Sequence, residues 1–253
     1  MVTGSLIVDS GGNTSLGNKL FCVATILSLA WDNEDTPVFS EKVGHKNSIF
    51  KNLSYTPINL GDVSYYDEPS YRFNSIPYQK NIYLRGYFQS YKYFNKYTSR
   101  IQILLGIPTL DKFKLLDEVN PDKKYLGALH VRRGDYLYQP DHHPTATLDY
   151  YKEAIDRCPE VEHWIICSDD IDWCKDAFSF LPSKYFSEGR SDYEDIWLLS
   201  IADTYIIANS TFSWWSAWLS DSNRKKVIYP GNWFGPKVSH SIQDLIPPTW
   251  VRV

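Results

Sequence analysis

Residues 130–136 read HVRRGDY and bring a histidine and two arginines together in one short segment. A guanidinium group stays charged and can donate two parallel hydrogen bonds to a phosphate, so it can stabilise a diphosphate as a leaving group. One of the two arginines is expected to pair with Asp135, which makes this aspartate a structural partner. The segment predicts phosphate chemistry, because an integrin-binding Arg-Gly-Asp motif is not expected at the end of a strand.

A second polar segment, NSTFSWW at 209–215, follows an apolar run and opens a predicted helix. Backbone N–H groups and hydroxyls at a helix N-terminus form an anion site that needs no metal. The alternative is that Ser210 or Thr211 only caps the helix. Both interpretations stay open at this point.

Residues 168–170 (Ser-Asp-Asp) follow another apolar run and allow three interpretations. Asp169 or Asp170 could bind a guanine edge or a ribose, could hold a divalent metal, or could cap a helix that starts near Ile171. A metal site would need further carboxylates, and the arginines already supply positive charge for a diphosphate. No metal is therefore expected, and the pair His142 and His143 is assigned to an exposed loop.

These polar segments alternate with apolar runs and helical patterns in the second half of the chain. Strands are predicted at 126–131, 164–167, 205–208 and 227–229, and helices at 148–157, 171–178, 192–202 and 213–220. Strand alternating with helix implies a parallel sheet with right-handed crossovers. The polar segments come directly after strands, at the edge where open α/β sheets bind ligands.

The first half of the chain gives weaker patterns. A short strand at 6–8 is followed by a Gly-rich loop over 11–18, which lacks the lysine and the glycine register of known phosphate loops. A helix is predicted from Leu20 onward, a strand at 83–88 and a helix over 91–105. Two domains are expected, 1–124 and 125–253.

The amino-acid composition narrows the class of protein further. The chain has 253 residues, 43% hydrophobic and 22% charged, which is typical of a globular protein, and its net charge of −4 gives no global field for nucleic acid. No segment approaches the ~20 apolar residues of a membrane span, so a cytoplasmic location is expected. Four cysteines are expected to be buried free thiols: Cys22, Cys158, Cys167 and Cys174.

Taken together, the motifs resemble those of the α-1,2-fucosyltransferases, glycosyltransferase family 11, and they follow family order along nearly the whole chain. The matching segments are LGNKLFCVA at 16–24, LRGYFQSYKYF at 84–94, HVRRGDY at 130–136, LDYYKEAI at 148–155, CSDDIDWC at 167–174 and IIANSTFSWWSAWLS at 206–220. The combination of HVRRGDY with NSTFSWW is the specific part of the match.

The resemblance implies an α/β fold of the GT-B kind, with two Rossmann-like domains and a cleft between them. The first domain would serve the acceptor and the second would bind the GDP-sugar. The implied reaction is transfer of L-fucose from GDP-fucose to a hydroxyl of a glycan acceptor, galactose O2, with inversion and without a metal or other cofactor.

The resemblance also assigns residues. Arg132 would contact the diphosphate as the catalytic residue. The donor-binding set would be His130, Arg132, Arg133, Asp169, Asp170, Asn209, Ser210, Thr211 and Phe212, with His130 and one of the two aspartates near the guanosine. Gly17 and Asn18 would line the cleft from the N-terminal side. No general base is identified, and Asp9 is one option.

The chain departs from the family pattern where residues 13–15 interrupt the usual Gly-Gly-Leu-Gly-Asn loop. Two alternatives remain beside the fucosyltransferase interpretation. One is a transferase that uses another nucleotide sugar on the same scaffold. The other is a non-catalytic glycan-binding module, suggested by an aromatic content of 16%.

Overall fold

The computed structural model describes residues 1–5, 15–39, 48–56, 61 and 63–253. These residues form two compact units, the first made of Met1–Leu105 with Ser241–Pro247 and the second of Gly106–His240 with Pro248–Val253. The units thus differ from the expected ranges 1–124 and 125–253.

Two segments account for the difference. Residues 106–124 carry a helix that packs on a helix of the second unit, and this helix was not predicted. Residues 241–247 return to the first unit, where Asp244 forms an ion pair with Lys92 and accepts a hydrogen bond on its backbone oxygen from Ser90 Oγ at 2.8 Å. Sequence periodicity contains no information on such a return.

The first unit has a parallel sheet of three strands in the order β1-β3-β2. Its elements are β1 (Val2–Gly4), α1 (Leu16–Asp32), β2 (Ser64–Asp67), β3 (Ile82–Arg85), the 3-10 helices η3 (Tyr91–Tyr93) and η4 (Asn95–Tyr97), and α2 (Thr98–Leu105). The strand predicted at 83–88 is therefore β3. The helix predicted over 91–105 is α-helical only from Thr98 onward, because Ser90 Oγ accepts the N–H of Lys92 and starts a 3-10 turn. The strand predicted at 6–8 and residues 11–14 of the Gly-rich loop lie outside the described residues.

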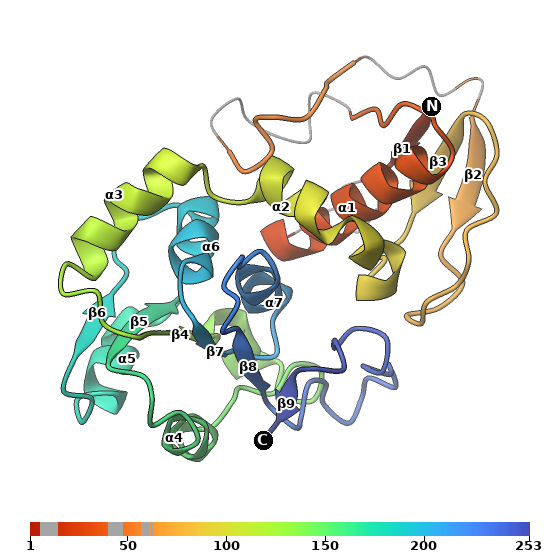
Figure 1. Cartoon of the computed structure of the whole chain (residues 1–253). Helices are drawn as coiled ribbons and strands as arrows, with labels where there is room; N and C mark the ends of the chain where they lie inside the picture. The colour runs from red at the N-terminus through yellow and green to blue at the C-terminus, as the bar shows by residue number, and fades with distance from the viewer. Residues whose placement is uncertain (6–14, 40–47, 57–60, 62) are drawn as a thin grey trace. The chain divides into compact units, whose positions relative to one another are not determined.

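The second unit has a parallel sheet of six strands in the order β6-β5-β4-β7-β8-β9 (Figure 1). Its elements are α3 (Thr109–Val119), β4 (Leu126–Val131), the 3-10 helix η5 (Gly134–Tyr138), α4 (Leu148–Asp156), β5 (His163–Ser168), α5 (Ile171–Ala177), β6 (Lys184–Phe186), α6 (Asp192–Ser200), β7 (Thr204–Ile206), α7 (Thr211–Trp218), β8 (Lys226–Tyr229) and β9 (Val251–Arg252). The predicted parallel α/β arrangement is confirmed. The sequence did not predict α3, β6 and β9.

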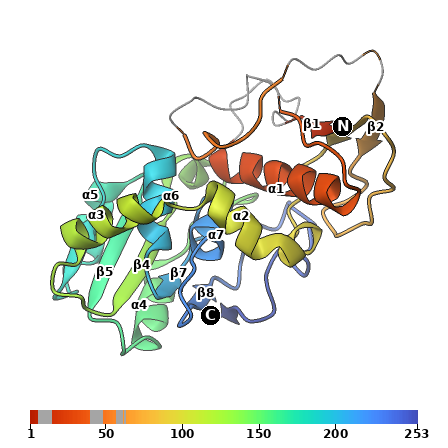
Figure 2. The same cartoon turned by 45° about the horizontal axis from the view of Figure 1, so that its top comes forward.

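Helices cover both faces of this sheet. Figures 1 and 2 show α4 on one side and α6 and α7 on the other. Side chains alternate along a strand, so Leu129 and Val131 join the core cluster that includes Tyr151 of α4 and Phe178 after α5. His130 consequently points to the other face, toward α6 and α7.

The strand order defines where a ligand is expected. From β4 the chain runs outward to β5 and β6, then crosses back to β7 on the opposite side of β4. The point between β4 and β7, where the strand order reverses, is the position at which open α/β sheets bind nucleotides, outside the carboxyl ends of the strands. The HVRRGDY segment follows β4 and the NSTFSWW segment follows β7, so the topology brings both to this point.

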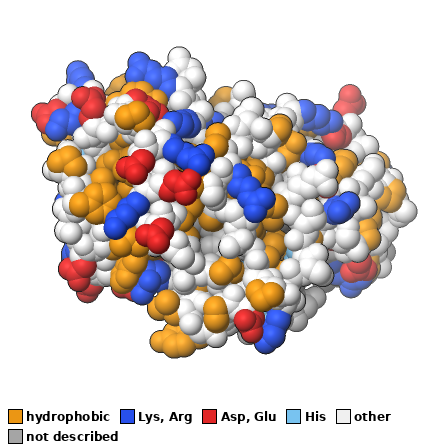
Figure 3. Space-filling view, turned by 90° about the horizontal axis from the view of Figure 1, so that it is seen from below, with side chains coloured by type: hydrophobic (Ala, Val, Ile, Leu, Met, Phe, Trp, Pro, Cys, Tyr) orange, Lys and Arg blue, Asp and Glu red, His pale blue; other side chains and the backbone are white. Residues whose placement is uncertain are grey.

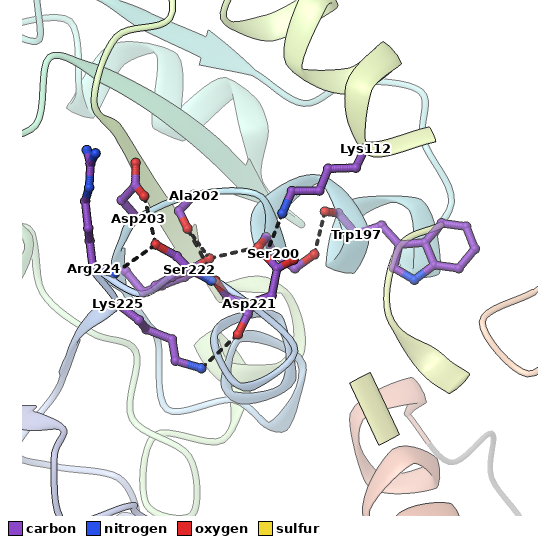
Figure 4. A network of polar contacts seen from close by, with 11 residues as sticks. Lys112, Trp197, Ser200, Ala202, Asp203, Asp221, Ser222, Arg224 and Lys225 are labelled. Atoms are coloured by element: carbon purple, nitrogen blue, oxygen red, sulfur yellow. Dashed lines mark hydrogen bonds and ion pairs between the residues drawn. The ribbon is translucent and has the colours of Figure 1, made fainter. Parts of the chain in front are cut away.

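The amino edge of the same sheet carries a different polar network (Figure 4). Lys225 Nζ donates to the backbone oxygens of Trp218 and Ser220, at 3.4 and 3.0 Å, where α7 ends. Ser222 Oγ donates to Asp203 Oδ1 at 2.8 Å, just before β7. These contacts satisfy backbone acceptors at the end of α7 and fix the turn into β8.

Three predictions about the chain as a whole can be compared with the structure. All four cysteines are free and buried, as predicted. No helix in the described part of the chain is long and apolar enough to cross a bilayer. On the face shown in Figure 3, acidic and basic side chains are interspersed and form no large basic patch.

Candidate functional site

The arginines lie where β4 ends and η5 begins. Gly134, the first residue of η5, lies against the side chain of Asp169, so that a Cβ atom at this position would lie 2.4 Å from Asp169 Oδ2. The glycine of the HVRRGDY motif therefore lets the turn after β4 approach the turn after β5. That approach brings two arginines and two aspartates together.

Arg132 lies between two carboxylates. Its Nη1 is 2.9 Å from Asp169 Oδ2, and its Nη2 is 2.5 Å from Asp135 Oδ1. The predicted pairing of one arginine with Asp135 is thus made by Arg132. Its side chain is still 34% exposed, so the guanidinium is held in place by carboxylates and remains accessible to a ligand.

Arg133 is held by a second set of contacts. Its Nε donates to Asp170 Oδ2 at 2.8 Å, its backbone N–H donates to Asp169 Oδ1 at 2.9 Å, and its guanidinium lies 4.3 Å from the ring centre of Trp173. Asp170 also accepts the N–H of Trp173 at 3.3 Å and is the N-cap of α5, which confirms the capping interpretation for this aspartate. The hydrogen bond from Arg133 lowers the pKa of Asp170. The predicted contact of Asp169 or Asp170 with guanine stays a prediction.

His130 is buried beneath the first turn of α7. Its ring lies 4.9 Å from that of Phe212, with 31° between the ring planes, and its Nδ1 has no hydrogen-bond partner among the described residues. Burial, with the nearby charge of Arg132, lowers the pKa of His130 to about 3. The imidazole is therefore neutral at physiological pH, and the positive charge of the site comes from the arginines.

The NSTFSWW segment has two structural tasks. Asn209 is buried, and its Nδ2 donates to the backbone oxygens of Pro144 and Trp233, both at 2.9 Å. Ser210 Oγ accepts the N–H of Phe212 at 3.3 Å and caps α7, so the capping interpretation is confirmed for Ser210. The first turn of α7 begins at Thr211, and N–H groups at a helix N-terminus are a site type that can bind an anion.

Two aromatic residues of the site were missed at the sequence level. The ring centre of Tyr136 lies 5.2 Å from the Arg132 guanidinium, and its ring stacks on that of His143 at 4.9 Å and 19°. Burial raises the pKa of Tyr136 to about 12, so the hydroxyl keeps its proton and can donate to Asn209 O at 3.3 Å. Trp173 supports Arg133 in the same way. The available signal was the position of these residues within the motifs, since Tyr136 ends HVRRGDY and Trp173 lies in CSDDIDWC.

Gly17 and Asn18 lie in the first turn of α1, in the first unit. Asn18 Oδ1 accepts a hydrogen bond from Gln89 Nε2 at 3.0 Å, which ties the turn to the LRGYFQS segment. Their predicted role in lining a cleft stays a prediction. Asp9 lies outside the described residues.

No group of three or more His, Cys, Asp or Glu side chains in the described part of the chain is arranged to hold a metal ion. In the loop around 141–143, Asp141 pairs with Lys237 at 2.8 Å, and His143 stacks on Tyr136. Metal independence of the reaction remains a prediction that needs a measurement.

Guanidinium groups and a helix N-terminus at the switch point of a parallel sheet are features of nucleotide-binding α/β proteins. Comparison with known families makes this class specific. The model of "Glycosyl transferase family 11" matches residues 27–253, and the chain belongs to this family. The predicted family, and an enzyme of the fucosyltransferase type, are thereby confirmed.

Curated relatives of the chain are glycosyltransferases. It is 33% identical to an alpha-1,2-colitosyltransferase of Escherichia coli over 73% of its own length and 69% of the relative's. It is 34% identical to the O-antigen biosynthesis glycosyltransferase WbnK of Escherichia coli, over 69% of its own length, and spans 62% of that relative. A galactoside 2-alpha-L-fucosyltransferase of Caenorhabditis elegans is 25% identical, over 94% of this chain and 76% of the relative.

Two solved structures share the fold. The chain matches the NodZ alpha-1,6-fucosyltransferase soaked with GDP-fucose with a TM-score of 0.52 and 14% identity, over 87% of this chain and 90% of that one. It matches the fucosyltransferase NodZ from Bradyrhizobium with a TM-score of 0.53 and 12% identity, over 83% and 91%. At these identities the match concerns the fold, and the predicted GT-B-like α/β class is confirmed.

Proposed function

We propose that this protein transfers L-fucose from GDP-fucose to O2 of a galactose residue in a glycan, with inversion at the anomeric carbon. The observation that carries the proposal is the position of Arg132, held by Asp135 and Asp169 at the switch point of the sheet. The relatives support the sugar and the linkage, because two of them are named as α-1,2 or 2-alpha transferases of colitose and L-fucose.

The proposed reaction is a single displacement. The acceptor oxygen forms a bond to C1 of fucose while the bond from C1 to the β-phosphate oxygen breaks, and GDP leaves on the opposite face with the bonding electrons. Negative charge grows on the β-phosphate, and this is the charge that the protein must stabilise. Arg132 lies at the switch point to do so, with Arg133 beside it and the first turn of α7, around Thr211, as a second donor.

The carboxylates around the arginines serve preorganisation in this proposal. A guanidinium held by Asp135 and Asp169 already has a fixed orientation, so little reorganisation is needed when a phosphate approaches. The remaining proposed donor contacts are those of His130, Phe212, Asn209 and Ser210, through the nucleoside and the geometry of the turn. A metal is not required, because the arginines supply the positive charge.

A second donor is favoured by one observation, the 33% identity to an alpha-1,2-colitosyltransferase. Colitose is L-fucose without the 3-hydroxyl group, so both GDP-sugars present the same diphosphate. A site that hydrogen-bonds a substrate hydroxyl rejects the analogue that lacks it, whereas a site that is apolar at that position accepts both. The ratio of kcat/KM for GDP-fucose and GDP-colitose distinguishes the two donors.

The test measures GDP release and product formation with a panel of donors and acceptors, with and without EDTA. We expect turnover with GDP-fucose and a β-galactoside, none with the 2-deoxygalactoside, little with GDP-mannose or UDP-galactose, and no effect of EDTA. Turnover with the 2-deoxy acceptor would exclude attack by O2. Glycan binding without GDP release from any donor would instead support a binding module, and loss of turnover on chelation would contradict the arginine-based account.

A further inference from the structure

The proposed transfer needs a base, because the acceptor hydroxyl must lose its proton as its oxygen bonds to C1 of fucose. The three aspartates beside the arginines each pair with a guanidinium group, and the hydrogen bond from Arg133 lowers the pKa of Asp170. His130 is also a weak base, because burial lowers its pKa to about 3. A carboxylate that binds no cation is a stronger base than any of these groups.

Glu68 of the first unit is such a carboxylate. It follows β2 directly and is half-buried, and its N–H donates to Arg85 O at 2.8 Å, which continues the pairing of β2 with β3. The guanidinium of Arg85 pairs with the neighbouring carboxylate of Asp67 at 2.6 Å. No ion pair between Glu68 and a cationic side chain occurs in the described residues, and burial raises the pKa of Glu68.

The two carboxylate oxygens of Glu68 have different surroundings. Oε2 accepts the backbone N–H groups of Tyr87 and Phe88, at 2.7 and 2.9 Å. A Cβ atom at position 86 would lie 2.6 Å from Oε2, so Gly86 allows the carboxylate to lie against the turn after β3. Oε1 accepts no hydrogen bond from the described residues. One oxygen is therefore fixed by the backbone, and the other can accept a proton.

Glu68 lies at the carboxyl edge of the three-stranded sheet, and this is the edge at which parallel α/β sheets bind ligands. The parallel strands β2 and β3 end at the register partners Asp67 and Arg85. Gln89, in the segment after β3, donates to Asn18 Oδ1 in the first turn of α1 at 3.0 Å. The ends of two strands and the start of a helix thus meet around the turn that Glu68 binds.

The titratable groups that interact electrostatically with Glu68 are a thiol and phenols, and none of them is a cation. They come from α1, β2, the segment after β2, and η3: Cys22, Tyr66, Tyr71 and Tyr93. Burial raises the pKa of Cys22 and of Tyr71 to about 12, so both stay protonated where a carboxylate titrates. The ring of Tyr71 stacks on that of Tyr87 at 5.7 Å and 23°. These surroundings keep the carboxylate basic.

We propose that Glu68 is the general base of the transfer and that its Oε1 takes the proton of the attacking acceptor hydroxyl. The inference rests on the proposed function, which supplies the acceptor and the donor. The O–H bond breaks as the acceptor oxygen bonds to C1 of fucose, and GDP leaves with the electrons of the bond from C1 to the β-phosphate oxygen. Glu68 becomes a neutral carboxylic acid and returns the proton to water after the product has left.

The test is the variant Glu68→Gln in the full chain. Glutamine keeps an oxygen that can accept the N–H groups of Tyr87 and Phe88, but it cannot take up the proton. We expect kcat for transfer to fall by about 10²–10⁴, as for the loss of a general base. The Tm and the calorimetric affinity for GDP should stay close to those of the wild type. Asp67→Asn makes the same change of charge at the exposed neighbouring residue, and as the matched control it should keep the wild-type kcat.

The pH profile of kcat is a readout that a purely structural role would not change. In the wild type, kcat should fall on the acid side as Glu68 becomes protonated, at a pKa above the ordinary value of 4.5. Asp67→Asn should show the same fall. Glu68→Gln should lack it, because the group that titrates has been removed.

The alternative is that Glu68 only holds the turn after β3, where Phe88 has a left-handed backbone conformation with a φ of 51°. Under that alternative, Glu68→Gln keeps most of its kcat, and this result would overturn the proposal. A lower kcat with an unchanged acid side of the pH profile would overturn it as well.

Glu68→Asp provides a second measurement if Glu68→Gln does not fold, since it keeps the charge and withdraws it by one methylene. A wild-type kcat in Glu68→Asp would contradict the proposal. A kcat lower by about tenfold or more, with normal affinity for GDP, would support it. Wild-type protein that releases no GDP from GDP-fucose with any acceptor would instead overturn the proposed function, so the two failures are distinguishable.

Discussion

The two edges of the six-stranded sheet both carry charged networks, but they bind different partners. At the amino edge, Lys225 donates to backbone oxygens of Trp218 and Ser220, which are fixed parts of the fold. At the carboxyl edge, Arg132 pairs with two carboxylate side chains, those of Asp135 and Asp169, and its guanidinium lies 5.2 Å from the ring centre of Tyr136. A lysine bound to backbone carbonyls stabilises a helix end, whereas an arginine held between carboxylates can also bind an incoming phosphate.

This difference separates structural cations from functional ones within one domain. A structural cation satisfies acceptors that would otherwise remain unpaired, so its loss lowers stability and leaves the chemistry intact. A functional cation is oriented by partners that can share it, so its loss lowers the rate and has little effect on the fold. Substitution of the cation should therefore lower mainly the stability at the amino edge and mainly the reaction rate at the carboxyl edge.

The largest effect is expected for Arg132. Arg132→Ala should lower kcat by about 10²–10³, as for the loss of one preorganised donor to a developing charge. Arg132→Lys should lose most of the activity as well, because a point ammonium cannot donate two parallel hydrogen bonds to a phosphate. Steady-state kinetics of GDP release, with the Tm of each variant, are the measurement.

The matched control for this pair is Arg157→Lys, which changes an exposed arginine bound to Glu153 at 2.6 Å within α4 and its C-cap. Its kcat and Tm should stay close to those of the wild type. A kcat for Arg132→Lys near the wild-type value would exclude the bidentate role of Arg132.

The second prediction concerns the neutral histidine at the carboxyl edge. The pKa of His130 in the fold is about 3, below the value of about 6.5 for an unfolded histidine. The contribution of the neutral ring to stability is thus fully present above pH 6.5 and is lost as the pH falls toward 3. When the pH is lowered from 7.5 to 5.5, the free energy of unfolding of the wild type should fall by about 1.4 kcal/mol relative to that of His130→Asn.

Urea unfolding at the two pH values gives this difference, and His142→Asn is the control because His142 is exposed. The difference between the wild type and His142→Asn should be nearly independent of pH. If the difference in unfolding free energy between the wild type and His130→Asn does not change with pH, His130 is accessible to protons in the folded protein. The charge of the site would then not come from the arginines alone.

The sequence predicted the regular part of the fold because strand and helix patterns alternate there and the strands β4, β5 and β7 are buried over most of their length. It predicted β4, β5 and β7 within one or two residues, and the polar segments after them do meet at one edge. It missed β6, a three-residue strand of intermediate burial, and the helix α3, whose described side chains are mostly exposed. Short or exposed elements are stabilised by tertiary contacts that a local pattern does not contain.

The residue types in the motifs predicted where the site lies, and the structure shows which side chains pair there. The motif alone did not say which arginine pairs with Asp135, and it did not predict that Asp169 pairs with Arg132. Asp169 lies 37 residues after Arg132 in the sequence and reaches it only through the register of β4 and β5. Long-range register is the information that sequence motifs lack.

The third prediction tests the amino edge. Lys225→Met should lower the free energy of unfolding by about 1 kcal/mol, because it leaves the backbone oxygens at the end of α7 without their donor. Specific activity of the folded protein should stay at the wild-type level. Lys112→Met, which removes the exposed ion pair with Asp221, is the control and should cost no more than about 0.5 kcal/mol. A loss of kcat in Lys225→Met with normal stability would break the distinction between the edges.

The smallest effect is expected for Asp170, where one side chain combines a structural and an electrostatic contact. Asp170 caps α5 through the N–H of Trp173 and pairs with Nε of Arg133. Asn is as good an N-cap as Asp, so Asp170→Asn removes the charge and keeps the cap, and stability should change by a few tenths of a kcal/mol. Asp170→Ala removes both the cap and the charge and should cost about 1 kcal/mol more.

Because Arg133 loses a charged partner in either variant of Asp170, the affinities for GDP and inosine 5′-diphosphate should shift by a common factor. A selective loss of GDP affinity in Asp170→Asn would instead assign base recognition to Asp170.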